Sequence, residues 1–192
     1  MTAERAFAIA GIIVGAGAGK RFGGPKAIAT LRDGRRFVDA AAETARDAGL
    51  SPLVTVLPPG VEAPHGAVYV VNARADGEQV VSVRLGLAQL ANTTVVGVVV
   101  WPVDHPFVTL ETVLAVIDGA RRTGAPIVRP QFEGEHGHPV FFHRDTWREL
   151  MTVADGGARA VVHAYGTRVA HVDVRDRGVL RDIDLPSDLD AD

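Results

Sequence analysis

The chain has 192 residues, the length of one ordinary globular domain. Apolar residues make up 47% and charged residues 22%, a balance that excludes a disordered chain. With 20 basic and 23 acidic residues the net charge is −3, which argues against a broad nucleic-acid-binding face. Because cysteine is absent, disulfides, iron–sulfur clusters, thiolate zinc sites and a cysteine nucleophile are excluded.

The longest strongly apolar run, residues 95–101, is far shorter than a membrane span. The first ten residues carry two charges and lead into glycine-rich sequence with no convincing cleavage site, so they predict a first strand and not a signal peptide. We therefore expect a cytoplasmic protein with neither a membrane nor a nucleic acid as its partner.

The first two-thirds of the chain alternates short apolar runs with segments of helical spacing. Residues 7–14 form a continuous apolar run ended by glycines, which is typical of a buried parallel strand. Thr109 is a good N-cap for one of the helices. Further strands are predicted at residues 53–57, 68–71 and 95–103, and helices at residues 37–48, 78–90 and 109–122.

The last third continues with shorter elements. Strands are predicted at residues 127–129, 140–142 and 169–174, and short helices at residues 145–150 and 158–165. The alternation predicts one α/β domain over residues 1–192, with a mostly parallel sheet and right-handed crossovers. Ligands of such sheets bind outside the carboxyl ends of the strands, so the loops after Val14 and Val103 are expected to share one site.

The strongest chemical signal is the loop over residues 14–26, which reads VGAGAGKRFGGPK. Glycines let successive backbone amides approach a phosphate, and Arg21 and Lys26 add positive charge; the alternative is a flexible turn with incidental basic residues. A P-loop would need glycine at Val14 and serine or threonine at Arg21, and a dinucleotide fingerprint would need glycine at Lys20. Neither pattern fits.

Two acidic segments are candidate metal sites. Asp104 follows a buried strand and precedes His105-Pro106, where a carboxylate could hold Mg²⁺ against phosphate oxygens or could simply cap a turn. Near the C-terminus, Asp182 and Asp184 are interpreted as pointing to opposite sides of an extended segment. We therefore expect at most one of them to face the site, with a solvated acidic tail as the alternative.

His136 and His138 form a His-x-His pair inside Gly134–Pro139. Such a pair can ligate zinc, but no third ligand stands out nearby, so a substrate-contacting loop or an ordinary turn is favoured. A serine hydrolase has little support, because the sequence has no G-x-S-x-G elbow. The remaining isolated histidines are predicted to be structural or exposed: His65, His143, His163 and His171.

Five segments, in the right order, resemble the MobA/MocA-like nucleotidyltransferases that activate the molybdenum cofactor. The glycine loop is similar to the pattern L-A-(A/G)-G-x-S-x-R-M-G-x-P-K, and residues 103–106 are similar to G-D-x-P. Residues 77–87, 137–140 and 182–189 are similar to G-E-M-L-S-S-x-x-x-G-L, G-H-P-V and D-I-D-x-P-x-D-L. Among the departures from these patterns, Gly19 stands for serine, Val103 for glycine, and Gln79 and Val81 alter the third segment.

The resemblance implies a three-layer Rossmann-like fold of the nucleotide-diphospho-sugar transferase type. It implies attack of a substrate phosphate on the α-phosphorus of a nucleoside triphosphate, with Mg²⁺ and release of pyrophosphate. Ala16 resembles the cytidylyl branch, so CTP is favoured, and molybdopterin is the expected acceptor. The implied roles are: catalytic, Arg21 and Lys26; nucleotide-binding, Val14, Gly15, Ala16, Gly17, Asn72, Gly77 and Ser82; metal-binding, Asp104 and Asp184; acceptor side, His138.

Three alternatives stay open on the sequence alone. The departures at Gly19 and Val103 suggest a non-catalytic nucleotide- or pterin-binding module that assists molybdoenzyme maturation. A sugar-phosphate nucleotidyltransferase would use the same chemistry, although such chains are usually longer. Asp182 and Asp184 also fit the D-x-D letters of a metal-dependent glycosyltransferase, but lie too near the C-terminus for the usual arrangement.

Overall fold

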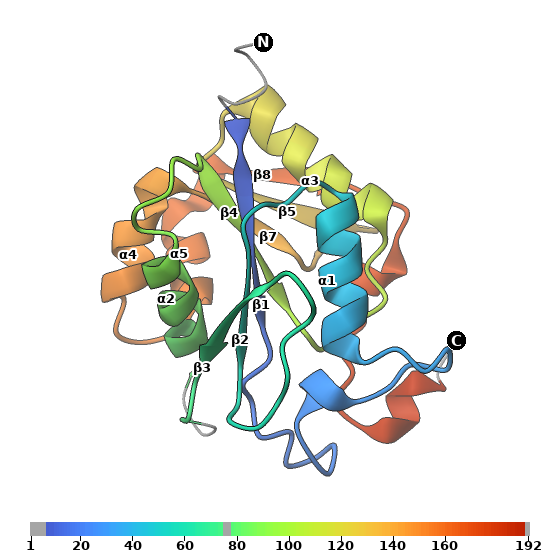
Figure 1. Cartoon of the computed structure of the whole chain (residues 1–192). Coiled ribbons are helices and arrows are strands. Elements are labelled where there is room, and N and C mark those ends of the chain that lie inside the picture. Colours follow the sequence, from blue (N-terminus) through green and yellow to red (C-terminus); the bar gives the residue numbers. More distant parts are fainter. Residues whose placement is uncertain (1–6, 75–77, 191–192) are drawn as a thin grey trace.

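A computed structural model describes residues 7–74 and 78–190. In this part of the chain eight strands form one sheet between two layers of helices, so the predicted three-layer α/β architecture is confirmed (Figure 1). None of the described helices is long and apolar enough to cross a membrane. The strands are β1 (Ile9–Val14), β2 (Leu53–Leu57), β3 (Val68–Val71), β4 (Gly97–Pro102), β5 (Ile127–Phe132), β6 (Glu135–His136), β7 (Val140–His143) and β8 (Val169–Asp173).

The main helices are α1 (Phe37–Asp47), α2 (Gln79–Gln89), α3 (Leu110–Thr123), α4 (Trp147–Thr152) and α5 (Gly157–Tyr165). Short 3₁₀ turns are η2 (Lys26–Ile28), η3 (Arg144–Thr146), η4 (Gly166–Arg168), η5 (Arg177–Val179) and η6 (Pro186–Leu189). Thr109 is the N-cap of α3 as predicted, because its side chain accepts a hydrogen bond from the Thr112 amide.

The sheet has two halves of different character. Its strand order is β3-β2-β1-β4-β7-β5-β6, with β8 beside β5. The first four strands are mutually parallel, and β1, β2 and β4 are buried along their whole length, as strands covered on both faces must be. In the second half, β7 is antiparallel to both β4 and β5, and β5 is parallel to β8.

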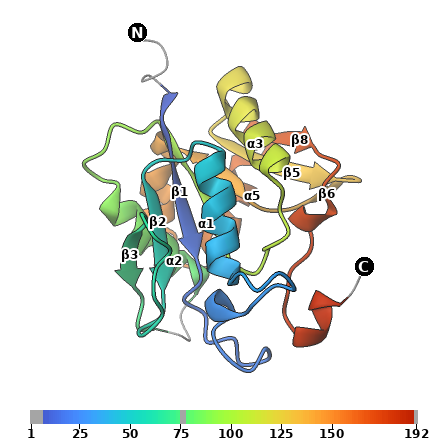
Figure 2. The same ribbon diagram turned by 45° about the vertical axis from the view of Figure 1, so that its right-hand side comes forward.

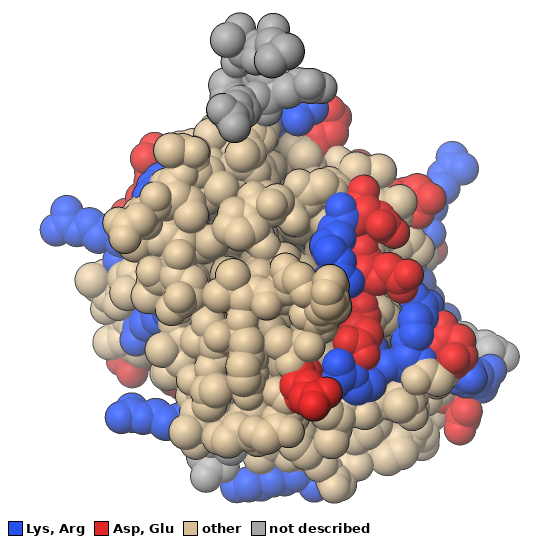
Figure 3. Space-filling model, in the orientation of Figure 1, with Lys and Arg blue, Asp and Glu red and all other residues tan. Residues whose placement is uncertain are grey.

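Helices cover both faces of the sheet. Helices α1 and α3 pack on one face around Phe37, Trp101 and Phe141, while α2, α4 and α5 pack on the other face around Ile12 and other aliphatic side chains (Figures 1 and 2). Gly86 lets α2 approach β1 closely, since a Cβ there would lie 2.7 Å from the Ile12 side chain. Charged side chains gather along α1, and much of the rest of that face of the molecule is uncharged (Figure 3).

Three distant parts of the chain meet at the carboxyl edge of the parallel half. Val14 ends β1 beside Pro102, the end of β4, and the Val103 amide donates to the Val14 carbonyl at 3.0 Å. The C-terminal segment reaches the same edge, because the Ile183 amide donates to the Asp104 carbonyl at 2.9 Å. Burial of the Ile183 side chain in the core holds this segment in place.

Candidate active site

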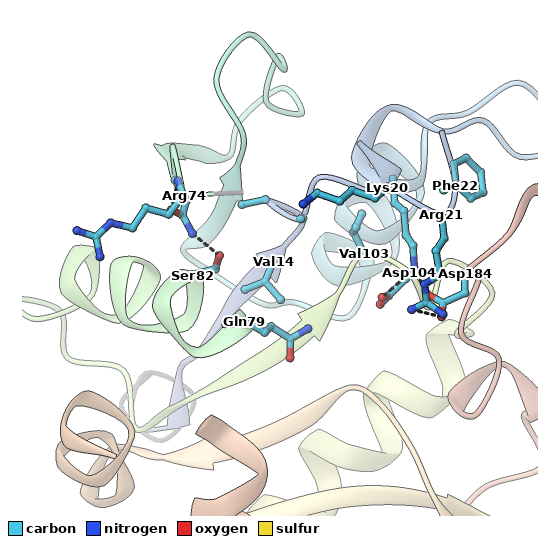
Figure 4. A pocket seen from close by; sticks show the side chains of 16 residues that line it. Val14, Lys20, Arg21, Phe22, Arg74, Gln79, Ser82, Val103, Asp104 and Asp184 are labelled. Carbon is cyan, nitrogen blue, oxygen red and sulfur yellow. Dashed lines mark hydrogen bonds and ion pairs between the residues drawn. The ribbon is translucent and has the colours of Figure 1, made fainter. Parts of the chain in front are cut away.

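One pocket at this edge is lined by most of the predicted site residues (Figure 4). It is lined by the glycine loop, by the segment after β3, by the start of α2 and by the carboxylates that follow β4 and precede η6. Gly77 lies outside the described residues. The predicted residues that line the pocket are Val14, Gly15, Ala16, Gly17, Arg21, Lys26, Asn72, Ser82, Asp104 and Asp184.

The conformation of the glycine loop explains one departure from the family pattern. Gly19 has φ +56°, and its carbonyl accepts hydrogen bonds from the amides of Gly23 and Gly24 at 2.9 and 3.2 Å. A Cβ at Gly19 would lie 1.8 Å from the Gly24 carbonyl oxygen. A serine therefore cannot occupy this position unless the loop rearranges.

The second departure, Val103, packs beneath the same loop. Its side chain is buried, and a Cβ added to Gly15 would lie 3.1 Å from Val103 Cγ1 and 3.2 Å from Leu57 Cδ2. The valine thus fills the space under the loop, and Gly15 is needed to leave room for it.

Lys26 lies at the centre of a charged cluster. Its Nζ donates to Asp184 Oδ1 at 2.6 Å and lies 3.5 Å from Asp104 Oδ2 and 3.6 Å from Asp182 Oδ1. Arg21 makes an ion pair with the other oxygen of Asp184 at 2.7 Å. Both predicted catalytic cations are therefore paired with a predicted metal ligand.

The pKa values in this cluster follow from burial and pairing. Burial opposes the charge on Lys26, but the hydrogen bond to Asp184 and the neighbouring carboxylates outweigh it, so the pKa of Lys26 is raised. The hydrogen bond from Lys26 lowers the pKa of Asp184. Burial and the charge of Asp104 raise the pKa of Asp182. At neutral pH the cluster therefore keeps the ammonium of Lys26 against the Asp184 carboxylate.

The interpretation that Asp182 and Asp184 point to opposite sides is wrong, although of the two only Asp184 lines the pocket. Residues two apart on an extended segment point to the same side. Ile183, between them, points into the core, and both carboxylates approach Lys26. Asp182 is thus a member of the charged cluster.

The carboxylates fit a divalent cation. Asp104 Oδ1 is buried and has no hydrogen-bond partner among the described residues, and Asp184 lies close because both carboxylates approach the same ammonium. Oxygen donors of this kind suit Mg²⁺. The described residues contain no group of three or more side chains placed to enclose a metal. Asp104 and Asp184 would therefore hold the ion together with phosphate oxygens and water.

The opposite end of the pocket carries polar groups suited to a nucleoside. Asn72 Nδ2 donates to Ser82 Oγ at 3.0 Å, and Asn72 Oδ1 accepts from the Arg74 amide at 3.0 Å. The exposed side chain of Arg74 lines the pocket and was not predicted, although it closely follows a strand whose carboxyl end faces the site. Sequence reasoning also left two other lining side chains without a role, Lys20 and Phe22, whereas Gln79 belongs to the segment that was expected near the base and ribose.

His138 does not line the pocket. It packs against His105, with ring centroids 4.8 Å apart, and the Nδ1 atoms of both rings are buried without a hydrogen-bond partner in the described chain. Burial, helped by His105, lowers the pKa of His138 to about 3, so its imidazole is neutral at physiological pH.

The His-x-His pair is not arranged as a zinc site. His136 stacks on His171 with ring centroids 4.3 Å apart, whereas His138 packs against His105. The two rings of the pair thus have different partners, and the described residues offer no third ligand around them. His171, expected to be isolated, therefore belongs to a cluster.

A phosphate-type glycine loop that faces carboxylates at the edge of a three-layer sheet is the arrangement of a nucleotidyltransferase. The family model of the MobA-like NTP transferase domain matches residues 11–171, and the chain belongs to this family. The resemblance in the sequence, the fold and the assignment to the nucleotidyltransferases are thereby confirmed. A search of curated proteins finds no match.

Solved structures show the same fold. Rv0371c from Mycobacterium tuberculosis H37Rv is 27% identical with a TM-score of 0.82, over 97% of this chain and 100% of that chain. A complex of Rv0371c with manganese is 26% identical with a TM-score of 0.72, over 88% and 89% of the two chains. The 2-C-methyl-D-erythritol 4-phosphate cytidylyltransferase of Thermus thermophilus is 22% identical with a TM-score of 0.68, over 95% and 96%, and shows the fold alone.

Proposed function

We propose that this nucleotidyltransferase moves a nucleoside monophosphate from CTP to a phosphorylated acceptor of the molybdopterin type, with Mg²⁺ bound and pyrophosphate released. The observation that carries the proposal is the meeting of the glycine loop, two cations and the carboxylates in one pocket. Transfer at phosphorus needs mainly positioning and neutralisation of charge, and this set supplies both.

The ion pairs in the pocket suggest how the site accommodates substrates. Arg21 and Lys26 each form an ion pair with one oxygen of the Asp184 carboxylate. A triphosphate would replace the carboxylate as the partner of these cations, and Asp104 and Asp184 would turn to the metal. Bound Mg²⁺ would withdraw charge from the phosphate oxygens during transfer. An oxygen of the acceptor phosphate forms a bond to the α-phosphorus, and the bond to the bridging oxygen of pyrophosphate breaks.

Two features support the choice of nucleotide. Ala16 is buried and lines the pocket, in agreement with the cytidylyl branch that its position resembles. Asn72 and Ser82, joined by a hydrogen bond, form a polar wall at the end of the pocket away from the carboxylates. A ribose and a pyrimidine there would meet hydroxyl and amide groups.

The acceptor is proposed to approach from the side of His138. His105 follows Asp104 in the chain, and the ring of His138 packs against that of His105. The Nδ1 atoms of both rings are buried and have no hydrogen-bond partner among the described residues. A buried polar atom without a partner is costly, so polar groups of an acceptor would stabilise this pair.

Pyrophosphate release with each of CTP, GTP, ATP, UTP and dTTP tests the proposal. We expect turnover with CTP, Mg²⁺ and molybdopterin, and its loss in Asp104→Asn. Asp145→Asn, which changes an exposed carboxylate, is the matched control. Full activity in both Asp104→Ala and Lys26→Ala would show that the site is assigned wrongly, and preference for another nucleotide would overturn the choice of CTP.

A further inference from the structure

A second group of basic side chains lies outside the pocket, on strands β5, β6 and β8. Arg129 and His171 are direct partners in the parallel register of β5 and β8, and Arg129 Nε donates to His171 Nδ1 at 3.3 Å. The ring of His136 stacks on that of His171, with 15° between the planes. These three residues are called the Arg129 cluster below.

Arg129 makes no ion pair in the described part of the chain, although the charge of Asp173 acts on His171. Among the described residues no carboxylate lies within ion-pair distance of Arg129, in contrast to Arg21 and Lys26 in the pocket. The acidic neighbour Asp173, on β8, accepts a hydrogen bond from Gln131 Nε2 at 2.7 Å. A half-buried guanidinium without an anion has lost part of its hydration and gained no ion pair in return.

The titration of the cluster agrees with this picture. Burial lowers the pKa of Arg129, and burial together with the charge of Arg129 lowers the pKa values of His136 and His171. The charge of Arg129 thus disfavours protonation of both histidines, while the charge of Asp173 partly opposes this effect on His171. An oxyanion that accepted hydrogen bonds from the guanidinium would relieve that repulsion.

The Arg129 cluster lies on the same face of the sheet as Val14, one of the residues that line the pocket. Ile127 and Val169 point into the core beneath α2, α4 and α5, and Arg129 and His171, two residues further along, point the same way. Val14 of the pocket belongs to that same core. Only β7 separates β5 from β4, so the cluster lies about 10 Å across the sheet from the strand that leads to Asp104.

We propose that Arg129, His136 and His171 form an oxyanion-binding subsite that holds a second anionic group of the acceptor, at the end remote from the reacting phosphate. This assignment rests on the proposed function. It specifies an elongated acceptor that carries one phosphate at Asp104 and one further oxyanion beyond β7. The guanidinium of Arg129 supplies charged hydrogen-bond donors that can bind an oxyanion in a bidentate way. The two imidazoles supply neutral hydrogen-bonding groups and a stacking surface.

Inorganic phosphate is the probe for this subsite. In low salt at pH 7.5, the histidine Cε1–H signals of His136 and His171 are followed by NMR as phosphate is added. We expect saturable shifts in the natural chain and affinity weakened about tenfold or more in Arg129→Gln, because a charged hydrogen-bond donor is lost. Arg122→Gln, which removes an exposed arginine paired with Asp118 on α3, is the matched control.

A second variant keeps the test informative if Arg129→Gln does not fold. His136→Ala changes an exposed side chain and is expected to weaken phosphate binding reported by His171. Shifts that do not saturate, or equal affinity in the natural chain and Arg129→Gln, would overturn the subsite.

The thermal shift caused by CTP and Mg²⁺ separates this proposal from the proposed function. We expect the same CTP shift in Arg129→Gln and in the natural chain, since Arg129 does not line the nucleotide pocket. Absence of any CTP shift or turnover would contradict the proposed function while phosphate binding at Arg129 still stood. Loss of the CTP shift in Arg129→Gln alone would contradict a subsite separate from the nucleotide.

Discussion

The two halves of the sheet present their polar groups in opposite ways. In the parallel half, Lys26 and Arg21 are both paired with the carboxylate of Asp184. In the mixed half, His138 has a buried nitrogen atom without a partner among the described residues, and Arg129 has no carboxylate within ion-pair distance there. The difference teaches that the cations of the first half are held in ion pairs, whereas the guanidinium of Arg129 in the second half is held by a neutral hydrogen-bond acceptor.

We expect the largest effect from removing a positive charge in the parallel half. Lys26→Gln should lower kcat/KM for pyrophosphate release about 30- to 1000-fold, or about 2–4 kcal/mol, as deletion of one stabilising donor does. Arg122→Gln, an exposed arginine on α3, should leave the rate unchanged. Steady-state kinetics on both variants provide the measurement. A loss below about threefold would mean that Lys26 only neutralises carboxylates.

We expect the buried His138 in the mixed half to make the free energy of unfolding depend on pH. The folded pKa of His138 is about 3, below the ordinary value of 6.5, so only the unfolded chain binds this proton between those values. Stability is therefore present above pH 6.5 and falls as the pH drops toward 3, by up to about 1.4 kcal/mol per pH unit. Urea unfolding at pH values from about 6.5 down to about 4.5 should show a steeper loss for the natural chain than for His138→Gln. His163→Gln, which alters an exposed histidine, should retain the full slope.

A pair of glycine substitutions measures how strongly the backbone shapes the loop. Gly19→Ala should cost about 2 kcal/mol, because the left-handed conformation is strained by a Cβ and the added atom meets the Gly24 carbonyl. Gly17→Ala, where a Cβ meets nothing within 4 Å, should change the free energy of unfolding by less than about 0.5 kcal/mol. Equal costs in urea unfolding would contradict the loop geometry.

The smallest effect concerns α3, which carries the chain from β4 to β5 and so joins the halves. Thr109→Ala should lower the free energy of unfolding by about 0.5–1 kcal/mol, since the cap to the Thr112 amide is long at 3.4 Å. Thr109→Asn retains a capping side chain and should cost less. Denaturant midpoints that rank these variants in reverse order would show that the cap is not the source of the effect.

Elements with a strong local signal were predictable from the sequence. The apolar runs of β1, β2 and β4 and the spacing of α2 and α3 appear within one or two residues of their predicted bounds. The insertion of β7 between β4 and β5 was not predictable, because strand order depends on pairing between distant segments. The two-residue strand β6 is likewise too short to carry a periodic pattern.

The candidate site was likewise predictable only where the sequence carries a local signal. Motif positions in the loop, after β4 and near the C-terminus were predicted and meet in one pocket. Asp182 was misjudged because the alternation of side chains was applied to the wrong pair, and Ile183 is the residue that points away. The stacking of His171 on His136 joins strands that are distant in the sequence and has no local signature.

The hydrogen bond between Lys26 and Asp184 joins residues 158 positions apart in the chain. During synthesis from the N-terminus, the glycine loop and its cations therefore emerge long before the carboxylate that neutralises them. Contacts of such large sequence separation form late, since the loop that they close must first be ordered. We therefore expect the pocket to be completed late in folding, once the segment around Asp184 has docked on the glycine loop.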